Sequence, residues 1–192
     1  MNRRDFLKSV ALSTFGLIGL NAFNVEAASV LSTAEPPICK RFFQFTEYDP
    51  RPTTEMIVIH HAGFEVDKDT TAAAVHRLHQ EVNGWAGIGY HYLIRKDGMI
   101  EQGRRPNMVG AHAYRHNKNS IGICLAGNFN LAKPTNEQMA SVKELVRWLC
   151  RKYDLNSEKH GVIVGHRDLN DTSCPGDYLY AKLDAIRRAA SN

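Results

Sequence analysis

This 192-residue chain contains three short, continuous apolar runs. They cover residues 56–60, 121–125 and 162–165, and they are rich in Ile and Val. Runs of this length are too short for helices, and continuous apolar character is typical of strands that are buried on both faces. The chain therefore needs a central sheet with other elements packed against it.

Helical patterns lie between and after these runs. Thr135 and Gln138 form a capping box at the start of one helix, and Asp97-Gly98 between two apolar runs is a strong hairpin signal. Helices and strands therefore alternate, and we predict an α/β fold with a mixed central β-sheet flanked by about three helices. The predicted helices are 70–83, 135–153 and 178–190, and the further predicted strands are an edge strand at 41–48 and hairpin strands at 90–94 and 99–102.

The first 27 residues have the order of a secretory signal. Arg3 and Arg4 precede an apolar run over 10–20, and small residues end at Ala27. The paired arginines indicate the twin-arginine route, so we expect export to the periplasm or beyond the cell. A membrane anchor is the alternative, but the run is shorter than the ~20 residues of a spanning helix, so we expect no stable membrane insertion after cleavage. The predicted organisation is a signal peptide at 1–27, a tether at 28–40 and one domain at 41–190.

The composition excludes some classes of partner. Apolar residues make up 43% of the chain and charged residues 23%, close to the average of globular proteins. The net charge of +4 comes from scattered Lys and Arg residues, without a basic stripe or a nucleic-acid-binding motif. We therefore expect no nucleic-acid partner, and we also expect a monomer.

Nine histidines is a high number for this length, and two of them follow predicted strands. His60 ends the first apolar run, His166 follows the last, and Cys174 comes eight residues later. Two histidines and a cysteine with one open position can form a catalytic zinc site. Spacing alone leaves open the alternative that these are ordinary buried or surface side chains.

Further motifs surround these residues, and together they resemble one family. They are Val58-Ile59-His60-His61, Gly89-Tyr90-His91-Tyr92-Leu93-Ile94, Asp97-Gly98-Met99-Ile100-Glu101, Gly110-Ala111-His112, Asn119-Ser120-Ile121-Gly122-Ile123-Cys124-Leu125-Ala126-Gly127 and Gly165-His166-Arg167-Asp168 with Cys174-Pro175-Gly176. The set resembles the N-acetylmuramoyl-L-alanine amidases of the type shared by phage T7 lysozyme and the animal peptidoglycan recognition proteins. The resemblance covers residues 41–188, nearly the whole predicted domain.

The resemblance implies zinc-dependent hydrolysis of the amide bond between N-acetylmuramoyl and L-alanine in peptidoglycan. It implies that Zn²⁺ is bound by His60, His166 and Cys174. His61 would point to the opposite face of its strand, because successive strand residues alternate, and we expect it beside the cleft or in solvent.

The resemblance also supplies candidates for the chemistry. Tyr90 matches the catalytic tyrosine of the family, and Thr172 stands where phage members carry lysine. The hydroxyl of Thr172 can donate a hydrogen bond to an oxyanion but cannot supply the charge of the lysine. The proton donor to the leaving amine stays open, with Glu101 as the nearest candidate in the matching motifs.

The remaining histidines have weaker assignments. His112 matches a family histidine near the cleft, and we predict that it contacts substrate together with His91. His76 and His79 lie on the first predicted helix, where we expect them to be solvated.

The implied partner is peptidoglycan or its muropeptide fragments. One alternative is a non-catalytic peptidoglycan-binding module, which the retained Cys174 disfavours; another is a cytoplasmic hydrolase of soluble fragments, which the export signal disfavours. A nucleophilic cysteine protease is a third and poorer alternative, because Cys174 precedes a proline in a loop and not a helix start. If Cys174 binds metal, Cys39, Cys124 and Cys150 can form at most one intrachain disulfide, whose pairing the sequence leaves open.

Overall fold

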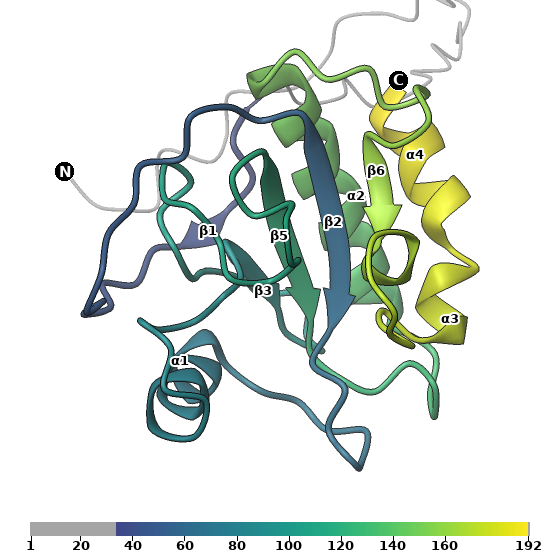
Figure 1. The fold of residues 1–192 in the computed structure, drawn as a ribbon. Coiled ribbons are helices and arrows are strands. Elements are labelled where there is room, and N and C mark those ends of the chain that lie inside the picture. The colour runs from purple at the N-terminus through teal and green to yellow at the C-terminus, as the bar shows by residue number, and fades with distance from the viewer. Residues whose placement is uncertain (1–33, 192) are drawn as a thin grey trace, which may run out of the picture. The chain divides into compact units, whose positions relative to one another are not determined.

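The computed structural model describes residues 34–191, which form a six-stranded mixed sheet with helices packed against it (Figure 1). The predicted signal peptide and residues 28–33 of the predicted tether lie outside this range. The strand order is β1-β4-β3-β5-β2-β6, and of these pairs only β3 with β4 is antiparallel. The strands are β1 (Ile38–Cys39), β2 (Met56–His61), β3 (Tyr92–Ile94), β4 (Ile100–Gln102), β5 (Ser120–Leu125) and β6 (Ile163–Gly165).

Helices cover both faces of this sheet, as predicted. Helix α1 lies apart from α2 and α4 in Figure 1, and each group packs on its own hydrophobic cluster. Leu93 on β3 packs with α1, whereas its neighbours Tyr92 and Ile94 pack in the larger cluster with α2 and α4. The helices are α1 (Ala72–Glu81), α2 (Asn136–Lys152), the one-turn α3 (Asp177–Tyr180) and α4 (Leu183–Ser191), with a 3₁₀ turn η1 at His166–Asp168.

The alternation of side chains along the central strands decides which face carries polar groups. Ile57 and Ile59 on β2 belong to the large cluster, so the intervening Val58 and the following His60 point to the opposite face. On β5 the residues on that opposite face are Gly122 and Cys124, since Ile121, Ile123 and Leu125 lie in the same large cluster. The α1 side of the central strands therefore combines small and polar residues.

Local signals in the sequence set the ends of the helices. The side chain of Thr71 accepts a hydrogen bond from the Ala74 main chain at the start of α1, and Thr135 and Gln138 form the predicted capping box of α2. The predicted hairpin is confirmed as β3 and β4. These agreements confirm the predicted fold class.

Two predicted elements differ from the structure. The edge strand predicted at 41–48 is wrong: the edge strand is β1, which lies in the segment predicted to be a tether and pairs with β4. Phe43 and Phe45 instead pack their rings against His76 of α1, with centroids 4.6 and 5.2 Å away. The single closing helix predicted at 178–190 is divided into α3 and α4.

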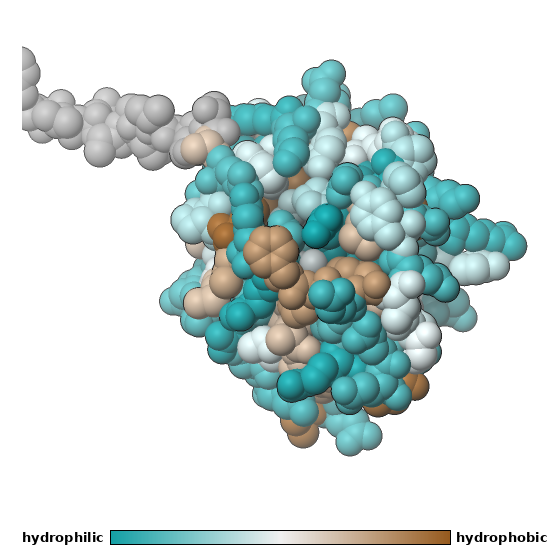
Figure 2. Space-filling view, turned by 90° about the vertical axis from the view of Figure 1, so that its left-hand side faces the viewer, coloured by the Kyte–Doolittle hydropathy of each residue, from teal (hydrophilic) through white to brown (hydrophobic). Residues whose placement is uncertain are grey.

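The face in Figure 2 is largely hydrophilic, with apolar side chains gathered toward its middle. No helix within residues 34–191 has the length and apolar character needed to cross a membrane. All four cysteines, each within the described range, are free thiols.

Candidate metal centre

The two candidate histidine ligands come from neighbouring parallel strands. The register of β2 and β6 places Ile59 opposite Gly165, so the next residues, His60 and His166, lie side by side at the carboxyl ends of these strands. Their ring centroids are 4.6 Å apart. The two strands therefore bring together side chains that are more than a hundred residues apart in the sequence.

Cys174 reaches the same point from the loop between η1 and α3. Its Sγ lies 3.6 Å from Nδ1 of His60, and one ligand atom each of His60, His166 and Cys174 lie within 4.8 Å of one another. Nitrogen and sulfur ligands at the usual zinc distances and tetrahedral angles are about 3.6 Å apart. The structure thus confirms that the three predicted residues form one cluster, and their donor set and spacing fit a zinc ion.

The unused nitrogens of both histidines are held by neighbouring polar groups. Nε2 of His60 lies 3.1 Å from Nδ1 of His112, and Nε2 of His166 lies 3.0 Å from Oδ1 of Asn170. This leaves Nδ1 of each ring as the atom that can bind a metal. Such outer contacts orient the ligand rings and are a regular part of metal sites in proteins.

His112 connects His60 to the protein framework. With Nε2 of His60 as donor, Nδ1 of His112 accepts, and Nε2 of His112 can donate to the Ser120 hydroxyl at 3.4 Å. That hydroxyl donates in turn to the carbonyl of His116 at 2.6 Å. The space for the His112 ring exists because residue 122 is glycine: a Cβ there would lie 2.5 Å from the ring.

Burial fixes the protonation states of the candidate ligands in the metal-free chain. It lowers the pKa of His60 well below the usual range, with the nearby His166 acting in the same direction, and it also lowers the pKa of His166. Both rings are therefore neutral near pH 7 and able to bind a metal. Burial raises the pKa of the Cys174 thiol to about 12, so metal binding must release its proton.

Tyr90 lies on the same side of the sheet as His60. Its ring centroid is 5.1 Å from that of His60. Burial raises the pKa of Tyr90 well above the usual range. The side chain is thus a neutral phenol next to the metal centre, which can act as a hydrogen-bond donor.

A cleft of ≈ 550 Å³ opens beside the ligands. Thr172 lies in its wall, where its Oγ1 accepts a hydrogen bond of 3.2 Å from the main chain of Cys174. Two exposed aromatic side chains, Trp85 and Tyr114, also line the cleft and were not expected from the sequence. The lining residues are Trp85, Tyr90, Ala111, His112, Ala113, Tyr114, Asn117, His166, Asn170, Asp171 and Thr172.

His91 has a framework position. Its side chain has no exposed surface; its Nδ1 accepts from the Gly122 main chain at 3.0 Å, and its Nε2 donates to the carbonyl of Met108 at 2.9 Å. Burial lowers the pKa of His91 to about 3, which keeps the ring neutral. A direct contact of His91 with substrate, as predicted from the sequence, has no surface on which to occur.

Three other histidines are buried where the sequence suggested solvent or the cleft. His76 and His79 on α1 accept hydrogen bonds from the main-chain N–H groups of Ile88 and Gly89, at 3.2 and 3.0 Å. His61 points to the α2 side of the sheet, where its Nδ1 accepts from the Phe129 main chain at 3.1 Å. All three are 7% exposed, so the expectation of solvated side chains is wrong.

Glu101 is also a structural residue. It is fully buried; one carboxylate oxygen accepts from the Ala72 main chain at 2.6 Å, at the first residue of α1, and the other accepts from Arg41 at 2.9 Å. The carboxylate lies at the positive end of the helix and does not line the cleft. It is therefore no candidate for proton donation in the cleft.

Sequence reasoning missed Asn170, which holds the second histidine ligand. Its spacing four residues after His166 was the available signal, because a turn of helix brings such residues together. The turn η1 does so here, and Nδ2 of Asn170 extends the contact to the carbonyl of Tyr114 at 3.4 Å.

Comparisons with known proteins agree with this geometry. Residues 49–177 match the family model described as N-acetylmuramoyl-L-alanine amidase. The endolysin of Enterobacteria phage T3 is 34% identical over 134 residues, which cover 67% of this chain and 85% of the endolysin.

Solved structures give the same result. The amidase LysC from Clostridium intestinale URNW superposes with a TM-score of 0.71 at 36% identity, covering 79% of this chain and 97% of LysC. A point mutant of Drosophila PGRP-LB in complex with tracheal cytotoxin superposes with a TM-score of 0.68 at 28% identity, covering 77% of this chain and 93% of PGRP-LB.

Proposed function

Because the chain belongs to the N-acetylmuramoyl-L-alanine amidase family, we propose that it is a zinc-dependent hydrolase of the amide bond between N-acetylmuramoyl and L-alanine in peptidoglycan. The observation that carries this proposal is the third donor: Sγ of Cys174 lies 3.6 Å from Nδ1 of His60, in one cluster with His166. Zinc bound by such a set supplies a water activated for attack near neutral pH and polarises the amide carbonyl.

Tyr90 would stabilise the charge that develops during the reaction. Its phenol keeps its proton, because burial raises its pKa, and it lies beside His60 on the wall of the cleft. A neutral donor fixed at this position can hydrogen-bond the carbonyl oxygen as that oxygen becomes negative. The Tyr90 carbonyl accepts a hydrogen bond of 2.9 Å from the Arg104 main chain, so the side chain is already in place when the charge develops.

Thr172 would provide a second donor to the same oxygen. Because its Oγ1 already accepts a hydrogen bond from the Cys174 main chain, its own proton is free to point into the cleft. The bond also ties the hydroxyl to the loop that carries the metal ligand. A hydroxyl here supplies a hydrogen bond but no positive charge, so more of the stabilisation must come from the metal and Tyr90.

The cleft supports peptidoglycan or muropeptides as the substrate. The exposed rings of Trp85 and Tyr114 offer flat apolar surfaces, and the cleft is also lined by the ring of His112, whose two nitrogens bond to His60 and Ser120 and leave the ring face for a contact. A related structure, that of the PGRP-LB mutant, holds tracheal cytotoxin. We retain His112 as a proposed substrate contact and do not retain His91.

The proposal is tested by incubating the purified mature protein with intact sacculi and identifying the released products by mass spectrometry. We expect free stem peptides, one zinc per chain, and loss of both in Cys174→Ala. Cys39→Ser, which alters another partly buried cysteine away from the cluster, should keep both. Binding to sacculi without release by the zinc-loaded protein would favour the alternative of a peptidoglycan-binding module, and release by Cys174→Ala would refute the zinc mechanism.

We also propose that the chain is exported by the twin-arginine route, on the evidence of Arg3, Arg4 and the apolar run that follows. This route carries folded proteins, so the metal could be inserted before export. The substrate of the proposed reaction lies outside the cytoplasmic membrane, which agrees with export.

A further inference from the structure

Arg167 directly follows the proposed metal ligand His166. Its main chain and side chain form hydrogen bonds with the loop that carries Cys174. Its main-chain N–H donates to the carbonyl of Cys174 at 2.8 Å. In the side chain, Nη2 donates to the carbonyl of Ser173, and Nη1 donates to Oδ1 of Asp177 at 2.7 Å. One residue thus binds Ser173 and Cys174 in the loop and Asp177 at the start of α3.

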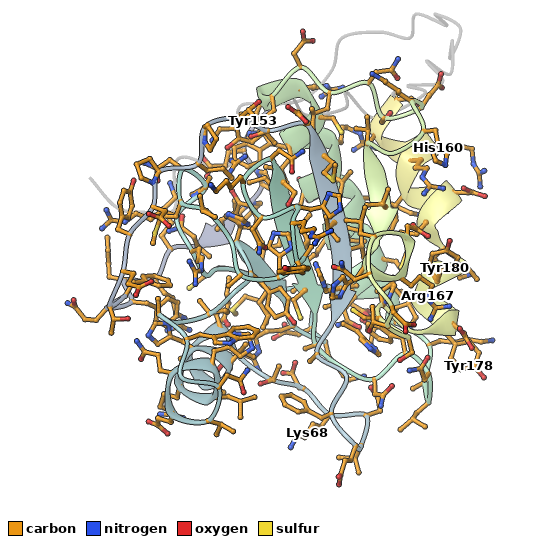
Figure 3. All side chains as sticks on the ribbon, in the orientation of Figure 1. Lys68, Tyr153, His160, Arg167, Tyr178 and Tyr180 are labelled. Atoms are coloured by element: carbon orange, nitrogen blue, oxygen red, sulfur yellow. The ribbon has the colours of Figure 1, made fainter. Side chains whose placement is uncertain are left out.

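The guanidinium group is held in place by Tyr180. It lies over the Tyr180 ring, 4.7 Å from the centroid, and the two side chains are seen close together in Figure 3. The Tyr180 hydroxyl donates to Oδ1 of Asp168 at 2.6 Å, and Oδ2 of Asp168 accepts from the Gly165 main chain at 2.8 Å. Arg167 is therefore connected through Tyr180 to the end of β6, from which His166 also projects.

These contacts differ in how strongly they hold the Arg167 side chain. The Asp177 side chain is 82% exposed, and an ion pair with such a group contributes little. The hydrogen bond to the Ser173 carbonyl and the stacking on the Tyr180 ring can form together only when the planar guanidinium has one orientation. Nε of Arg167 is buried and has no hydrogen-bond partner among the described residues. The head group is therefore held by its two terminal nitrogens and by the Tyr180 ring.

We propose that Arg167 is a positioning residue: it holds the Cys174 loop against Tyr180 so that the thiol stands at the correct distance from His60 and His166. This inference rests on the proposed zinc site. Asn130 also holds this segment, donating from Nδ2 to the Ser173 hydroxyl at 3.3 Å and accepting at Oδ1 from the Asp177 main chain at 3.2 Å, whereas Arg167 binds the main-chain carbonyls of Ser173 and Cys174 themselves. Arg167 is accordingly expected to set the affinity for metal and not the stability of the sheet.

The test measures zinc affinity by competition with a chromophoric chelator in the full mature protein. Arg167→Lys keeps the charge but cannot stack and donate in the same geometry, and we expect affinity to fall by about 10- to 100-fold. Arg187→Lys is the matched control, because Arg187 also donates from Nε and Nη2 to a main-chain carbonyl, that of Ile163, and from Nη1 to an exposed aspartate. Asp177→Asn should leave affinity within about twofold, since that carboxylate is exposed.

A spectroscopic measurement separates positioning from general destabilisation. With Co²⁺ in place of zinc, the thiolate-to-metal absorption should weaken in Arg167→Lys and stay unchanged in Arg187→Lys. Tyr180→Leu, which removes the supporting ring and leaves Arg167 in place, should reproduce the loss of affinity. Equal affinity and equal absorption in Arg167→Lys and the wild-type protein would overturn the positioning role alone, whereas a wild-type protein that binds no zinc would overturn the proposed function together with it.

Discussion

Acidification should destabilise the chain through His79, which is buried among the side chains that shape the cleft. Its Nδ1 accepts from the Gly89 main chain at 3.0 Å, and its ring contacts those of Trp85 and Tyr90, with centroids 4.6 and 5.7 Å away. Burial, with a smaller effect of Arg104, lowers the pKa of His79 from 6.5 to about 4. Protonation would add a buried charge and remove the acceptor for Gly89.

The sign and size of this loss of stability follow from the difference between the His79 pKa values in the folded and the unfolded chain. Above pH 6.5 the ring is neutral in both the folded and the unfolded chain, so its contribution to stability is fully present. Below that pH the unfolded chain binds the proton first, and stability is lost until the pH reaches about 4. At about pH 5 the loss is about 2 kcal/mol, because each pH unit between the two pKa values corresponds to about 1.4 kcal/mol.

The assay is urea unfolding in the presence of a chelator, at about pH 7.5 and about pH 5. His79→Asn keeps an acceptor atom near the position of Nδ1 and removes the titration, so its loss of free energy of unfolding on acidification should be smaller than that of the wild-type chain by about 2 kcal/mol. Val75→Ala, another buried position of α1, should reduce stability equally at both pH values. If His79→Asn and the wild-type chain lose the same free energy on acidification, the assignment of acid sensitivity to His79 is refuted.

Three further predictions concern the site and export. Tyr90→Phe should lower kcat by about 10²–10³ while the zinc content stays at one per chain; an unchanged kcat would exclude the phenol from the reaction. Gly122→Ala places a Cβ 2.5 Å from the His112 ring, so zinc affinity should fall by at least about tenfold with an unchanged circular dichroism spectrum, and equal affinity would contradict the role of His112 in holding His60. Replacing Arg3 and Arg4 by lysine should leave the precursor in the cytoplasm in a fractionation experiment, and normal export would argue against the twin-arginine route.

Much of the fold could be predicted because local signals were strong. The continuous apolar runs marked β2, β5 and β6, and the capping box marked α2. The edge strand could not be found, because β1 consists of Ile38–Cys39 alone and its pairing with β4 is a long-range contact. The aromatic alternation at 41–48 was misleading, since Phe43 and Phe45 pack on a helix and Phe42 is 89% exposed.

At the site, too, residues marked by local motifs could be predicted from the sequence, whereas those placed by long-range contacts could not. The three metal-binding candidates carried motifs around them, and the structure brings them together. His76 and His79 were misjudged because polar side chains on a helix were assigned to solvent, although their spacing from Ala72 and Val75 places all four on one buried face of α1. Both rings accept hydrogen bonds from the loop before Tyr90, which satisfies their nitrogens in the interior, and this long-range contact could not be read from the sequence.

The different origins of the three metal-binding candidates have a consequence for how this scaffold can evolve. His60 is 1% exposed in the central strand β2, and His166 follows β6, so both are tied to the framework. Cys174 stands in a loop outside both hydrophobic clusters. On the proposed zinc mechanism, a single substitution at that codon would remove the reaction and spare the sheet, the helices and the cleft. If the proposed mechanism holds, a peptidoglycan-binding protein without hydrolytic activity would be one substitution away from the enzyme on this scaffold.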